Sequence, residues 1–222
     1  MNQTYMKEKK IFPLVMSMAL PMMLSMAFNS LYNIVDSYFV AKLSEDAMTA
    51  LSLVYPAQNL LTSVAVCFGV GVNAMISFYL GAQNQEKADK TATQGMVLGV
   101  LHGALLMVLF LGGMNLFLGM FTKSDAVRAL GMEYSNVVFL FSTIVTGGIT
   151  LEKIFQAVGR MRATMVSMIA GFVTNIVLDP LLIFGIGPFP RMEIAGAALA
   201  TRDPVTGISH LLCGGSFAGE AS

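Results

Sequence analysis

The chain has 222 residues, of which 55% are apolar and only 12% are charged, and its mean hydropathy is +0.71. A soluble globular domain carries about 25% charged residues, so this composition excludes an ordinary water-exposed surface and indicates a helical membrane protein. Thirteen basic and thirteen acidic side chains give zero net charge, which excludes the basic surface of a nucleic-acid-binding protein. Two cysteines provide no disulfide framework.

Five apolar segments follow one another, each longer than the roughly 20 residues needed to cross a bilayer. The connections between them are short and hold most of the charges, and short connections make consecutive helices antiparallel neighbours. We therefore predict an all-α, polytopic membrane bundle with five complete transmembrane helices. The predicted spans lie near residues 11–41, 50–81, 92–119, 130–156 and 160–186.

A sixth span begins at Ile194, in the segment IAGAALAT, and stops being a membrane segment at Arg202. Residues 202–222 are rich in glycine and serine, and they are too short and too polar to complete a crossing. We expect the natural frame to end near Thr201, with residues 202–222 as an atypical tail produced by truncation or a frameshift. The alternative is a genuine extracellular tail on a five-span protein.

The basic residues predict the orientation of the bundle. The N-terminus and the connections on its side of the membrane hold eight Lys and Arg residues, whereas the opposite side holds four. By the positive-inside bias, residues 1–10 form a cytoplasmic N-terminus. The first apolar stretch is too long for a signal peptide, so it is predicted to be a retained span.

Two aspartates lie within these apolar spans, Asp36 in NSLYNIVDSYFV and Asp179 in GFVTNIVLDPLLIF. An ionisable group at membrane depth is costly and usually marks a functional site. At 1.5 Å per residue, the two lie about 8 and 10 Å below the outer membrane boundary. If the first and fifth spans are neighbours, both carboxylates can share one outward-side cavity. The alternative is that each aspartate satisfies local backbone near a helix break, since Pro180 follows Asp179.

Further polar residues predict the lining of that cavity. Helical spacing places them on the same stripes as the aspartates or around Pro56, which is expected to kink the second span. The cavity-lining candidates are Tyr32, Asn33, Gln58 and Asn59.

Other features of the spans indicate packing or bending. Hydroxyl side chains of the fourth span are expected to bond the preceding turn. Pro13 and Pro21 are expected to interrupt the first span below Asp36. Glycines at four-residue spacing, from Gly95 to Gly103, indicate close helix contact in the third span.

No constellation of catalytic residues is present, so we expect neither an enzyme nor an organic cofactor. The one enzyme class compatible with two membrane aspartates is an aspartyl intramembrane protease, because two such residues can share a proton. Such enzymes typically show a Gly-x-Gly-Asp context, whereas Asp179 lies in Val-Leu-Asp-Pro. This departure argues against a protease.

Four segments together resemble the N-terminal half of a bacterial multidrug and toxic compound extrusion (MATE) transporter. They are PMMLSMAFNSLYNIVDSYFVAKLSEDAMTALSLVYP, GAQNQEKADKTATQGMVLG, LEKIFQAVGRMRATM and NIVLDPLLIFGIGPFPRMEIAGAALAT. The resemblance covers residues 11–201, which would form one lobe of a two-lobe transporter. It implies a multi-pass protein of the bacterial inner membrane that exports cationic or aromatic compounds in exchange for H⁺ or Na⁺.

The resemblance also implies a coupling site. Its first-helix and fifth-helix residues correspond to Asp36, Asn175 and Asp179, with Thr201 as a further contributor from the start of the sixth helix. Asn33 is expected to support Asp36. If the coupling ion is Na⁺, Asp36 and Asp179 are its expected ligands.

The chain lacks a second lobe, so the expected partners include a C-terminal lobe as well as membrane lipid and the exported compound. Alternating access requires two bundles that rock against each other, so we expect this chain to be an incomplete fragment. One alternative is a flippase for lipid-linked precursors or polysaccharides, although such proteins need a basic cavity and the spans show no buried Arg or Lys. Another is a non-transporting membrane fragment that assembles with a partner half.

Overall fold

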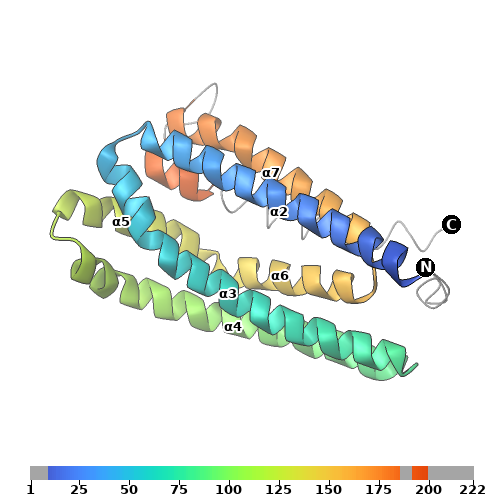
Figure 1. Cartoon of the computed structure of the whole chain (residues 1–222). Coiled ribbons are helices and arrows are strands. Elements are labelled where there is room, and N and C mark those ends of the chain that lie inside the picture. The colour runs from blue at the N-terminus through green and yellow to red at the C-terminus, as the bar shows by residue number, and fades with distance from the viewer. Residues whose placement is uncertain (1–9, 186–191, 200–222) are drawn as a thin grey trace.

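The computed structural model describes residues 10–185 and 192–199, and every regular element in these ranges is a helix. This confirms the all-α prediction. Residues 193–199 are helical, as expected for the start of a sixth span. The other helices, shown in Figure 1, are α2 (Ile11–Ala41), α3 (Glu45–Gly81), α4 (Gln85–Phe121), α5 (Asp125–Leu140), α6 (Ser142–Ala157) and α7 (Met161–Phe184).

Within the described residues, four helices are long and apolar enough to cross a membrane by themselves: α2, α3, α4 and the part of α7 from Ala163 to Phe184. The shorter helices α5 and α6 meet the same criteria together, and they are bent by 48° at the break between them. Counting this pair as one span gives five, in agreement with the sequence. The fourth span is nevertheless broken, which the sequence did not predict.

The break lies at Phe141, where the backbone leaves the α-helical geometry (φ −97°, ψ 8°). The hydroxyl of Ser142 donates to the carbonyl of Phe139 at 2.7 Å, and the Phe141 N–H donates to Val138 O in a shorter-range turn. Serine hydroxyls compete in this way with the regular helical hydrogen bonds. Close approach of α4 also contributes, because a Cβ added to Gly103 would lie only 2.7 Å from the backbone of Thr143.

Helices α3, α4 and α5 begin about five to seven residues before the predicted span starts, because each has a polar first turn. Each is capped by a side-chain oxygen that accepts from the backbone N–H three residues later, and each has an acidic residue in its first turn. Hydropathy marks only the part of a helix inside the bilayer. The capping bonds are Ala47 N to Ser44 Oγ at 3.0 Å, Lys87 N to Asn84 Oδ1 at 3.0 Å, and Val127 N to Ser124 Oγ at 3.4 Å.

The prolines do not interrupt the helices that contain them. Pro13 lies in the first turn of α2, where a missing N–H is tolerated, and α2 continues through Pro21 to Ala41. Helix α3 likewise continues through Pro56. The prolines therefore do not end these helices, because membrane helices re-satisfy the freed backbone groups locally, and the bends expected at them stay predictions.

The helices form two groups. Helices α2 and α7 pack along each other, and α3, α4 and α6 form a second group that α5 joins (Figure 1). Contacts between α2 and α3, and between α6 and α7, are much sparser. A space lined by side chains therefore remains between the groups.

The glycine stripe of α4 packs as predicted. A Cβ at Gly95 would lie 2.6 Å from Val72 of α3, and one at Gly99 would lie 2.5 Å from Thr150 Oγ1 of α6. At Gly103 an added Cβ would overlap Thr146 Oγ1. The hydroxyls of Thr146 and Thr150 each donate to a carbonyl four residues earlier, which confirms that expectation too. Helix α4 therefore packs closely against both α3 and α6.

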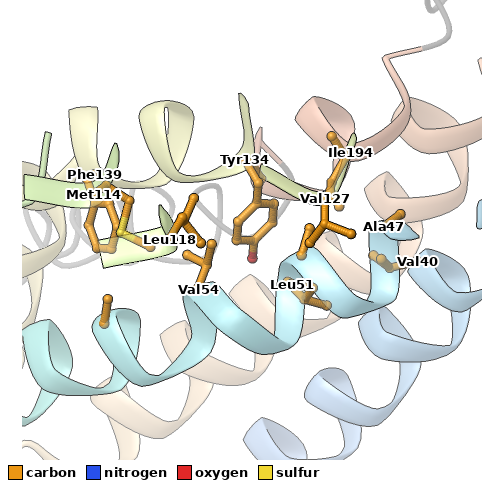
Figure 2. Packing of buried hydrophobic residues seen from close by; sticks show 14 of the residues in the cluster. Val40, Ala47, Leu51, Val54, Met114, Leu118, Val127, Tyr134, Phe139 and Ile194 are labelled. Carbon is orange, nitrogen blue, oxygen red and sulfur yellow. The ribbon is translucent and has the colours of Figure 1, made fainter. Parts of the chain in front are cut away.

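The largest apolar core lies at the end of the bundle that holds the α2–α3 turn (Figure 2). Leu51 and Val54 of α3 pack there with Tyr134 of α5, and Ile194 lies in the same cluster. Val40 near the end of α2 and Ile183 near the end of α7 belong to it as well. This core joins the two helix groups at one end of the bundle.

Candidate functional site

Helix α7 carries Asn175 and Asp179 one turn apart, and both residues are 0% exposed. Helix α2, which packs along α7, carries Asp36 at 7% exposure. We call these three residues the acidic cluster. The structure therefore brings together the two aspartates and the asparagine that the sequence singled out.

The acidic cluster has unpaired polar atoms. Asp36 Oδ1, both side-chain polar atoms of Asn175 and both carboxylate oxygens of Asp179 are buried and have no hydrogen-bond partner in the part of the chain that the structure describes. Buried polar atoms are nearly always paired, and an unpaired carboxylate is especially costly. The reading that Asp179 satisfies local backbone near a helix break is therefore wrong, and α7 continues past Pro180 to Phe184.

The two carboxylates lie close enough for the charge of Asp36 to act on Asp179. Two negative charges in a poorly solvated site repel each other, and a bound proton or small cation relieves that repulsion. The available oxygens, from two carboxylates and one amide, are of the kind that hard cations prefer. Within the described residues, no group of three or more His, Cys, Asp and Glu residues is placed to hold a metal ion.

Beside the acidic cluster lies a cavity of about 900 Å³. Its wall is formed by α2 and α7 on one side and by α3, α5 and α6 on the other. Asp36 is part of the wall, whereas Asn175 and Asp179 do not line the cavity. Through Asp36, the acidic cluster therefore adjoins a space large enough for a drug-sized molecule.

Three of the four predicted lining residues, Asn33, Gln58 and Asn59, form part of the cavity wall. The Gln58 amide donates to the Tyr134 hydroxyl at 3.4 Å. The Asn33 amide donates to Asn29 O at 2.7 Å, one turn back along α2, rather than to Asp36. Direct support of Asp36 by Asn33 is therefore not found among the described contacts.

Two predicted residues cannot be placed in this description. Thr201 and the tail 202–222 lie outside the described residues. The side chain of Tyr32 does too, although its backbone belongs to α2.

A second polar group lines the cavity near the turn between α6 and α7, and the sequence did not predict it. Glu152, Lys153 and Gln156 form this ion-paired cluster in the last turns of α6, and all three line the wall. The Glu152 and Lys153 side chains are only 12% and 14% exposed. Lys153 is therefore half-buried in the cavity wall, a position that the expectation of no buried Arg or Lys within the spans leaves out.

The signal for this cluster was present but ambiguous. Lys153 counts toward the positive-inside bias, and that bias predicts a position at the membrane boundary. Helix α6 continues to Ala157, however, and places residues 152, 153 and 156 within one turn of each other. A charged pair at adjacent positions with a glutamine four residues after the acid is compatible with either a surface or a buried site.

Comparisons with known proteins identify a family and a fold for this chain. A family model described as MatE matches residues 21–181. The Multidrug export protein MepA of Staphylococcus aureus (strain NCTC 8325 / PS 47) is 30% identical over 198 residues, which cover 89% of this chain and 43% of that protein. The MepA protein of Staphylococcus haemolyticus (strain JCSC1435) is 29% identical over the same length.

Solved structures show the same fold. An outward-facing multidrug resistance MATE family transporter of the MOP superfamily matches with a TM-score of 0.86 at 25% identity, over 94% of this chain and 46% of that chain. A MATE structure in the bent conformation matches with a TM-score of 0.84 at 28% identity, again over 94% of this chain and 46% of that one. The chain spans less than half the length of the relatives that it matches.

Proposed function

The chain belongs to the MatE family, a family of transporters rather than enzymes, and on that premise we propose that it is the N-terminal lobe of a multidrug exporter driven by inward H⁺ or Na⁺. The observation that carries the proposal is the set of unpaired buried atoms in Asp36, Asn175 and Asp179, of which Asp36 also lines a drug-sized cavity. A site of this kind costs free energy when it is empty and charged, and binding of a cation offsets that cost.

Coupling would act through the pair α2 and α7. A proton or Na⁺ bound between Asp36 and Asp179 removes the repulsion between the two helices that carry them. Asp36 is also part of the cavity wall, so its neutralisation weakens the attraction of the wall for a cationic compound. A cation and a drug that both use Asp36 compete, and this competition is what exchange transport requires.

The wall of the cavity suits varied apolar compounds. Methionines from several helices line it, among them Met26 of α2, Met48 of α3 and Met168 of α7. Methionine is flexible and polarisable, and surfaces rich in it adapt to different ligands. Together with the carboxylate of Asp36, this favours cationic aromatic substrates, in keeping with the names of the multidrug export relatives.

Transport would need a second lobe. Relatives that export drugs are more than twice as long as the part this chain matches. Alternating access requires one helical bundle to move against another around a central site. We propose a C-terminal lobe as the partner, in a bacterial inner membrane, with residues 1–10 in the cytoplasm and Thr201 near the cation site.

The ion-paired cluster bears on the flippase alternative. A transporter of lipid-linked anionic head groups needs a net basic cavity, and Lys153 is the only Lys or Arg among the described lining residues. Its charge is balanced by Glu152 at 3.1 Å, and Asp36 adds a further negative charge. The cavity is therefore acidic overall, which favours a multidrug exporter.

The test is drug efflux by Asp36→Asn in cells that produce this lobe together with its C-terminal lobe. Removal of the carboxylate abolishes both cation binding and competition, so we expect efflux of a cationic dye to fall by a factor of at least ten. Asp46→Asn is the matched control, because Asp46 is exposed in the first turn of α3 and lies outside the cavity. Efflux at the level of the unmodified protein in Asp36→Asn would overturn the proposal.

A further inference from the structure

The ion-paired cluster has a defined geometry on the α6 wall of the cavity. Lys153 Nζ donates to Glu152 Oε1 at 3.1 Å and to Gln156 Oε1 at 3.2 Å. The Gln156 amide donates to the same Glu152 Oε1 at 2.6 Å. Each of the three side chains thus contacts the other two, and their positions are fixed relative to one another.

Helix α3 holds Lys153 in place from behind. The amide of Asn73 donates to the backbone carbonyl of Lys153 at 2.8 Å. Gly69, one turn away, leaves room for the lysine stem, since an added Cβ would lie 2.8 Å from Lys153 Cγ. The ammonium is therefore held at the wall rather than free to extend away from the cavity.

The cluster retains bonding capacity toward the cavity. An ammonium has three N–H donors, and two of those of Lys153 are used within the cluster. Glu152 Oε2 accepts no hydrogen bond from the described residues, and it is not among the fully buried unpaired atoms. One donor and one acceptor, carrying opposite charges, thus remain side by side in the cavity wall.

We propose that the ion-paired cluster is a substrate subsite that binds a polar group carrying both a positive and a negative charge, that is, the zwitterionic end of an amphipathic molecule. The substrate ammonium bonds Glu152 Oε2 and its carboxylate bonds Lys153 Nζ. A balanced pair gives little attraction to a simple cation, because Lys153 repels what Glu152 attracts. The substrate class therefore includes zwitterions as well as cations, which use Asp36.

This inference rests on the proposed function, since it assigns a second subsite in the same drug cavity. The remainder of the wall between Asp36 and the cluster includes apolar side chains such as Met26 and Phe172. An aromatic body can pack there while its polar end lies at the cluster. The inference thus accounts for a buried charge pair that cation coupling does not use.

The experiment compares two dyes that differ in one group: Nε-dansyl-lysine, whose α-ammonium and α-carboxylate lie on one carbon at the end of an aromatic body, and the methyl ester of the same compound. The first is a zwitterion, and the second is a cation of nearly the same shape. Binding of each is measured by fluorescence anisotropy in detergent micelles. The Asp36→Asn form of the 222-residue chain is the reference and the background of every variant, so that the cation site at Asp36 does not contribute. We expect the free acid to bind about tenfold more tightly than the ester, as for one charge-assisted hydrogen bond.

Two variants locate the effect. Lys153→Met leaves Glu152 uncompensated, so the preference should reverse and the ester should bind more tightly. The double variant Glu152→Gln/Lys153→Met carries no buried charge at this site, and it should bind the two dyes within about twofold of each other. Lys90→Met is the matched control, because Lys90 is exposed on α4 and lies outside the cavity, and it should keep the original preference.

The outcomes separate the two proposals. If both dyes bind but neither variant changes their ratio, the subsite is wrong and drug binding by the lobe stands. If the Asp36→Asn chain prefers the ester, the subsite is likewise wrong. If neither dye binds to a chain whose circular dichroism shows intact helices, the proposed drug cavity fails and the subsite fails with it.

Discussion

The acidic cluster and the ion-paired cluster both hold ionisable side chains that are largely shielded from solvent, and both adjoin one cavity, yet they differ in how their atoms are paired. In the acidic cluster, five polar atoms have no partner within the described chain. In the ion-paired cluster, an acid, a base and an amide bond one another at 2.6 to 3.2 Å. The polar atoms of the acidic cluster need an added cation to be paired. Those of the ion-paired cluster already bond one another, and only one N–H donor and one oxygen acceptor are left for a ligand.

Burial alone therefore does not identify a coupling site. Substitution of one partner in a satisfied charge pair destabilises the protein, because it leaves the other charge shielded from solvent and uncompensated. A cluster of unpaired polar atoms is stabilised when a proton or cation binds, because binding lowers its free energy. Substitutions in the two clusters should therefore alter stability in opposite directions.

The largest expected effect on stability is that of Lys153→Met. Glu152 would lose its counter-ion while it remains mostly buried, which costs about 3 kcal/mol at a buried pair. The thermal unfolding midpoint in detergent should fall accordingly. The double variant Glu152→Gln/Lys153→Met should recover most of that loss, and a double variant as unstable as the single one would show that the pair is not what holds this wall.

The opposite sign is expected for Asp179→Asn. Replacement of a fully buried, unpaired carboxylate by a neutral amide of the same shape removes a desolvation cost. The free energy of unfolding in sodium-free buffer should therefore rise by about 1–2 kcal/mol. Efflux by the two-lobe protein should be lost in the same variant. A clear loss of stability would indicate that Asp179 has a structural partner and would remove the contrast between the clusters.

For Gly103→Ala we expect a smaller decrease in the free energy of unfolding, of about 1 kcal/mol. The added methyl group would overlap Thr146 Oγ1 and approach the backbone of Thr143, so α4 must move away from α6. Gly112→Ala on the same helix is the control, because nothing lies within 4 Å of its added Cβ and alanine favours the helix. Equal midpoints for the two variants would show that α4 does not set the position of the α6 wall.

The sequence predicted the helical spans and the acidic cluster because both depend on hydropathy and helical spacing. Apolar stretches of membrane length have few alternatives to a helix. Asp36 and Asp179 are conspicuous because their surroundings are apolar, and their similar depth suggested that they meet. That they lie together depends on the packing of α2 along α7, which only the structure supplies.

The sequence could not predict the broken fourth span or the ion-paired cluster. The break at Phe141 depends on one hydroxyl, that of Ser142, and on the close approach of Gly103 from another helix. The position of Lys153 depends on Asn73, which is 80 residues away in the chain. Hydropathy predicts that a lysine near the end of a span lies at the membrane boundary. It does not show the contacts that place the side chain in the cavity wall.

The most direct test of the central claim is whether a drug and a cation displace each other at the acidic cluster. A cationic dye is added to the 222-residue chain in weakly buffered detergent, and proton release is followed with a pH indicator while release of bound radioactive Na⁺ is measured in parallel. Linkage requires dye binding to expel the coupling ion if both use Asp36. We predict that one of the two ions is released by the unmodified chain and neither by the double variant Asp36→Asn/Asp179→Asn, and equal release by both proteins would contradict the account.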